Sequence, residues 1–110
     1  MMKDFTQQQV QDLNRLLNEF NDRCTYIKTL LIRLSEDFRY MDTYELDEDI
    51  AVVYLPKAIT IDLGYIKSDQ KFYLTVYKDG DWNNQLEVLE TDDIEKIKGI
   101  LQKLIDKYSL

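Results

Sequence analysis

The chain has 110 residues, of which 45% are hydrophobic, and a formal net charge of −7. This length supports one small hydrophobic core, so we expect a single domain over residues 1–110. The absence of histidine removes the usual general base near neutral pH and the commonest metal ligand, which argues against an enzyme. No run of 18 apolar residues occurs and the N-terminus turns polar at once, so we expect a cytoplasmic protein that does not contact membranes.

The first predicted element is a long helix over residues 6–38. Apolar side chains recur there at alternating spacings of three and four, and the segment lacks Gly and Pro. This heptad seam consists of Val10, Leu13, Leu17, Phe20, Cys24, Ile27, Leu31, Leu34 and Phe38. Such a helix would be about 50 Å long, more than the width of a small domain. We therefore expect a homodimer seam from Val10 to Ile27, with burial of the whole seam inside one chain as the alternative.

A four-stranded antiparallel β meander is predicted over residues 44–89. Apolar and polar side chains alternate in 44–55, 58–66 and 71–78, and a fourth strand follows at 85–89. Pro56 ends the first strand. Asp79-Gly80 predicts a tight hairpin turn, because both central positions of that turn favour positive φ.

A short C-terminal helix is predicted over residues 92–109. Thr91 or Asp92 would cap it, and its apolar stripe runs through Ile94, Ile97, Leu101, Leu104 and Tyr108. The predicted fold class is therefore α+β: a long N-terminal helix, the meander and the short helix, with both helices packed on one face of the sheet.

The acidic residues are concentrated in two segments. Residues 42–49 and 79–95 carry twelve of the 21 acids and no base. They would repel nucleic acid and membranes, and steer the chain towards a basic protein partner, for instance a nucleic-acid-binding protein. The candidate contact acids are Asp42, Glu45, Asp47, Glu48, Asp49, Asp79, Asp81, Asp92 and Asp93. The alternative is that these acids only keep a small protein soluble.

Three aromatic residues are candidate anchors for the same partner. Tyr73 and Tyr77 have the parity opposite to the apolar residues of their strand, and Trp82 lies just beyond the hairpin turn. Aromatic side chains are enriched at binding hot spots. The alternative is that they stabilise a solvated sheet face through cross-strand pairs.

A calcium loop is the one metal motif to consider. Asp79, Asp81, Asn83, Gln85, Glu87 and Glu90 have the spacing of its ligands. However, Asn84 replaces the expected glycine, and the preceding residues alternate as a strand. The hairpin turn accounts for the same residues, so we expect no metal or other cofactor.

These features favour a non-enzymatic acidic protein-interaction module. In size, segregated charge and lack of catalytic residues, the chain resembles the small acidic inhibitors of phages and mobile elements, such as anti-restriction and anti-CRISPR proteins. That resemblance implies an inhibitor that blocks a basic nucleic-acid-binding partner. The alternative is a homodimeric structural or chaperone-like protein that acts through its helix seam.

Overall fold

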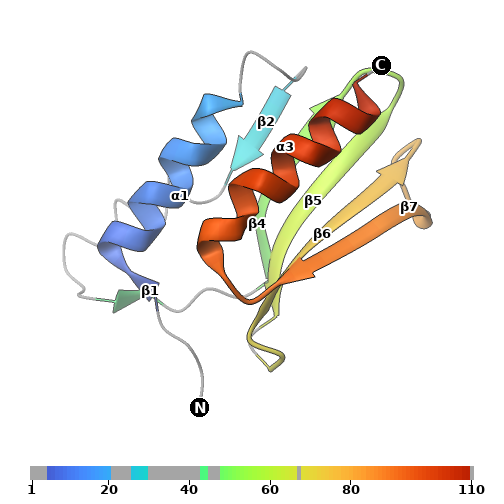
Figure 1. The fold of residues 1–110 in the computed structure, drawn as a ribbon. Helices are drawn as coiled ribbons and strands as arrows, with labels where there is room; N and C mark the ends of the chain where they lie inside the picture. Colours follow the sequence, from blue (N-terminus) through green and yellow to red (C-terminus); the bar gives the residue numbers. More distant parts are fainter. Residues whose placement is uncertain (1–4, 21–25, 30–42, 45–47, 67, 110) are drawn as a thin grey trace.

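The computed structural model describes residues 5–20, 26–29, 43–44, 48–66 and 68–109 (Figure 1). Its larger antiparallel sheet has the spatial order β2-β4-β5-β6-β7. These strands are β2 (Tyr26–Thr29), β4 (Glu48–Leu55), β5 (Ile59–Ile66), β6 (Lys71–Lys78) and β7 (Asp81–Thr91). A smaller sheet pairs β1 (Phe5–Thr6) with β3 (Thr43–Tyr44). Helices α1 (Gln7–Glu19) and α3 (Ile97–Tyr108) lie on one side of the larger sheet, which confirms the α+β class (Figure 1).

The predicted meander is present as β4 to β7, in which each strand pairs with the next. Asp79 and Gly80 both have positive φ, 60° and 67°, so the predicted hairpin turn is confirmed. Its first strand begins later than expected. Tyr44 belongs to β3 and pairs with Phe5, whereas β4 starts at Glu48.

The prediction of one long helix over residues 6–38 is wrong. Helix α1 ends at Glu19 with Phe20 as its C-cap, and Tyr26–Thr29 form strand β2. Residues 21–25 and 30–38 lie outside the described part of the chain. The segment of β2 is rich in aromatic and β-branched side chains, which favour strands, and β4 offers it a row of backbone partners.

The C-terminal helix forms close to its predicted position. A 3-10 turn, η3 (Ile94–Lys96), precedes α3. Asp93 caps this turn, in place of the predicted Thr91 or Asp92: its Oδ1 accepts a hydrogen bond of 2.9 Å from the Glu95 backbone N–H. Helix α3 itself begins after Lys96, without a side-chain cap. Thr91 Oγ1 in turn accepts one of 3.1 Å from the Asp93 backbone N–H, so β7 leads directly into the helix.

The core lies between the two helices and the inner face of the larger sheet. Leu13 and Leu17 of α1 and Leu101 and Leu104 of α3 are buried in it. The Lys98 Nζ and Glu19 Oε2 atoms, 3.1 Å apart, link the two helices at the surface. None of the helices among the described residues has the length and apolar character needed to cross a membrane.

Part of the predicted dimer seam contributes to this core. Leu13, Leu17, Phe20 and Ile27 are all buried within one chain. Val10 lies in α1, and Cys24 is outside the described residues. These four side chains are buried within one chain because α3 and the sheet cover them, on the face that the heptad pattern predicts to contact a second chain.

Candidate functional site

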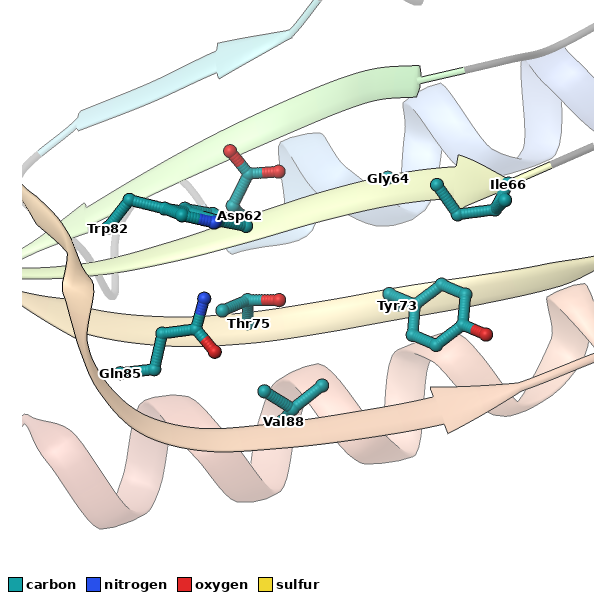
Figure 2. A pocket seen from close by; sticks show the side chains of 8 residues that line it. All are labelled: Asp62, Gly64, Ile66, Tyr73, Thr75, Trp82, Gln85 and Val88. Carbon is teal, nitrogen blue, oxygen red and sulfur yellow. The ribbon is translucent and has the colours of Figure 1, made fainter.

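The face of the larger sheet that points away from the helices contains a hollow of about 460 Å³. We call it the outer-face hollow. It is lined by Asp62, Gly64 and Ile66 of β5, Tyr73 and Thr75 of β6, and Trp82, Gln85 and Val88 of β7 (Figure 2). These residues come together because alternate side chains of paired strands share one face. Several apolar ones remain exposed, among them Val88 at 49% and Ile66 at 39%.

An irregularity in β7 places Trp82 over this face. Lys78 pairs with Asp81 and Tyr77 pairs with Gln85, so residues 82–84 are additional on the β7 side. The Asn83 backbone N–H donates a 2.9 Å hydrogen bond to Asp81 Oδ1 within this bulge. The indole packs edge-on against Tyr77, with 5.4 Å between ring centroids and 64° between planes. Trp82 is nevertheless 52% exposed, so its ring is available to a ligand.

At the other end of the hollow, polar groups hold Tyr73 in place. The Tyr73 hydroxyl donates a 2.9 Å hydrogen bond to Asp69 Oδ2, and this bond raises the pKa of Tyr73. Beside it, Lys71 Nζ lies 3.0 Å from Glu90 Oε1, and the bond to Glu90 raises the pKa of Lys71. Tyr73 therefore stays neutral and Lys71 stays charged at physiological pH.

Asp62 is the one ionisable acid or base among the described residues that line the hollow, apart from the Tyr73 phenol. It is half-buried in the middle of β5, with Trp82 lining the same space (Figure 2). A carboxylate accepts hydrogen bonds from guanidinium and ammonium groups, and the face of an indole attracts cations. The hollow thus combines groups suited to a basic side chain with apolar walls.

The predicted acidic contact residues do not gather around one point. Asp79 and Asp81 lie at the turn between β6 and β7, whereas Asp92 and Asp93 follow the opposite end of β7. Glu48 and Asp49 of β4 pair with Tyr65 and Gly64, at the same end of the sheet as Asp92. Asp42, Glu45 and Asp47 lie outside the described residues. The predicted contact acids that the structure describes are thus divided between the two ends of the sheet.

The residues of the calcium-loop spacing point in different directions. Gln85 lines the outer-face hollow, whereas Glu87 Oε1 accepts hydrogen bonds from Lys107 and Tyr108 on the helix side. Within the described ranges no group of three or more His, Cys, Asp or Glu side chains is placed to hold a metal ion. Asp79 has its role in the hairpin turn, as the sequence predicts.

Tyr73 and Tyr77 lie on the same sheet face, as their parity predicts, and the bulge in β7 brings Trp82 to that face as well. Sequence reasoning missed Asp62, Gln85 and Val88. Their parity within each strand is readable, but their proximity depends on the register, which pairs both Val88 and Asp62 with Thr75. The register of Val88 depends in turn on the bulge in β7.

Comparison with protein-family models, with curated proteins and with solved structures finds no match to this chain.

Proposed function

We propose that the protein is a non-enzymatic interaction module that binds a basic segment of a partner protein in the outer-face hollow. The observation that carries this proposal is the half-exposed Trp82, held against Tyr77 at the border of a hollow that also contains Asp62. An exposed, oriented aromatic ring beside a carboxylate is a suitable receptor for Arg or Lys.

The charge of the whole chain supports the same partner. A net charge of −7 raises the encounter rate with a basic surface and lowers it with nucleic acid. The acids at the two ends of the sheet would act in this long-range steering, while the hollow supplies short-range contacts. A nucleic-acid-binding protein has suitable basic segments, and occupying them would inhibit it.

Trp82 is the only tryptophan of the chain, so its emission reports on the hollow directly. We expect a hexa-arginine peptide to change Trp82 emission saturably, and the response to weaken between about 0.05 M and 0.5 M salt. Asp62→Asn should reduce the affinity by about tenfold, because it removes the charged acceptor. Asp12→Asn, which removes the same charge from the exposed surface of α1, should have little effect.

Two results would contradict this proposal. One is an equal emission response to a hexa-glutamate peptide. The other is an equal loss of affinity in Asp62→Asn and Asp12→Asn, which would show that general charge attraction, and not the hollow, binds the peptide.

A further inference from the structure

Strand β7 is at one edge of the larger sheet. Among the described strands it has a neighbour on one side only, β6. It contains 11 residues and neither Pro nor Lys, which commonly protect an edge from pairing, as bulges also do. Its bulge lies at residues 82–84, and from Glu87 to Thr91 the strand pairs with β6 in a regular register. Leu86 and Val88 of this strand are exposed apolar residues. An edge of this kind is a template for an added strand.

A second hollow adjoins β7 on the helix side. It measures about 520 Å³ and is lined by Glu90, Thr91, Glu95, Lys96, Gly99, Ile100 and Lys103. Gly99 leaves open space here, since a Cβ atom at this position would meet nothing within 4 Å. We call it the helix-side groove. Strand β7 thus has the outer-face hollow on one face and the helix-side groove on the other.

Because β7 is pleated, its side chains point alternately to the outer-face hollow and to the helix-side groove. Val88 pairs with Thr75 and points to the outer face, while Thr91 pairs with buried Phe72 and points to the helix side. Residues an odd number of positions apart lie on opposite faces of a strand. An added strand would therefore place one side chain over Val88 and another, three residues away, in the helix-side groove.

The chemistry of each position follows from its surroundings. The side chain over Val88 meets apolar surface, so it should be apolar. The one beside Thr91 meets Ile100 and the space above Gly99, in a groove that Glu95, Lys96 and Lys103 also line; Ile100 favours an apolar side chain there. The residue between them that shares the outer face would lie opposite Glu90, whose half-exposed carboxylate also holds Lys71 through Oε1 at 3.0 Å. A basic residue fits there.

We infer that β7 binds an extended segment of a partner by strand addition, and that the segment contains apolar, variable, basic and apolar residues in succession, read in either direction. Net charge favours such a partner over a second copy, because two chains of −7 repel each other. The inference rests on the proposed function only for the basic nature of the partner, since Val88 is the one residue under the added segment that also lines the outer-face hollow, and the helix-side groove shares no lining residue with it.

The test uses two acetylated and amidated peptides, Thr-Thr-Val-Thr-Arg-Leu-Thr-Thr and its reverse, with the full chain followed by NMR. We expect one of them to shift the amide signals of residues 85–91 and to slow their hydrogen exchange. N-methylation of alternate peptide bonds should weaken binding by about tenfold or more, because it removes the added backbone hydrogen bonds. Exchanging Arg with the neighbouring Thr, which moves the charge to the helix side, should weaken it similarly.

A variant addresses the helix-side groove. Gly99→Arg fills open space and should leave the fold unchanged, but it should weaken peptide binding by about tenfold. Ser109→Arg adds the same charge just after α3 and is the matched control. Equal effects of the two variants would overturn the inference, as would absence of binding at millimolar peptide.

The two proposals can fail separately. Trp82→Ala should change the affinity for the strand peptide by less than about twofold, because the indole lies beyond the added strand. A complete loss in Trp82→Ala would place the peptide in the hollow and overturn strand addition. Binding to β7 without any Trp82 response to hexa-arginine would instead overturn the proposed function.

Discussion

Glu87 connects the C-terminal helix to the edge of the sheet. Its Oε1 accepts hydrogen bonds of 2.8 Å from both Lys107 Nζ and the Tyr108 hydroxyl. These bonds, the one from Lys107 first, hold the pKa of Glu87 below its ordinary value of 4.5. The last turn of α3 is thereby fastened to β7, next to the helix-side groove.

We expect Glu87→Gln to lower the free energy of unfolding at pH 7 by about 1 kcal/mol, a value reduced by the exposure of Lys107. Because the pKa of Glu87 is lower in the folded state, this stabilisation is present above the unfolded pKa and is lost as the pH falls through the folded pKa. The difference between the two proteins in urea denaturation should therefore shrink below about pH 4. Tyr108→Phe retains the ion pair and is the control. A difference that stays constant down to pH 2 would contradict this role.

At the level of elements, a capping box stabilises the N-terminus of α1. The Gln9 backbone N–H donates to Thr6 Oγ1 at 3.2 Å, and the Thr6 backbone N–H donates to Gln9 Oε1 at 2.9 Å. Two N–H groups of the first turn are thus satisfied without tertiary contacts. The same Thr6 belongs to β1, so the cap also determines where the smaller sheet meets the helix.

Thr6→Ala should destabilise the protein by about 1 kcal/mol, since it removes the acceptor for the Gln9 N–H. Thermal or urea denaturation measures this difference. Thr6→Ser keeps the hydroxyl and should stay close to wild type. If Ser and Ala are equally destabilising, the methyl group of Thr6 and not the cap is responsible.

The sequence predicts the meander well and the first helix poorly, for a physical reason. Hairpins are local: alternation within each strand and the Asp79-Gly80 turn lie within a few residues of one another. The end of α1 carries no Gly or Pro, and the spacing of three and four continues through Ile27 although this residue is in a strand. What turns residues 26–29 into β2 is a partner, β4, that lies far along the chain.

In the candidate site, too, local patterns predict some positions and not others. Tyr73 and Tyr77 can be assigned to the outer face from parity alone, within one strand. Asp62 and Val88 need the register of three strands, and the position of Trp82 needs the bulge in β7. Register across a bulge is a tertiary property that no local pattern contains.

At the scale of the whole molecule, the buried seam bears on oligomeric state. Leu17 is fully buried and Leu13 nearly so, within one chain. A dimer through these side chains would have to remove them from the core. The homodimer itself stays a prediction. Light scattering at high micromolar concentration tests it, because it measures the molar mass in solution.

Leu17→Asp should unfold the chain, because an unpaired carboxylate in the core costs several kcal/mol, about as much as a small domain's stability. Circular dichroism and the scattering mass should report an unfolded chain. Asn18→Asp, at the adjacent exposed position, should remain folded. A folded Leu17→Asp monomer, together with a wild-type dimer, would instead show that the seam pairs two chains.

The arrangement of the core also determines how the chain can fold while it is being synthesised. Connections of two to four residues join β4 to β7, so these hairpins can close as they emerge. Helix α1 is made before the strands of the meander, but α3, which shares its core, is made after them. The apolar face of α1 therefore stays without its final cover until α3 has left the ribosome, and during that interval the nascent chain is most exposed to aggregation and most in need of a chaperone.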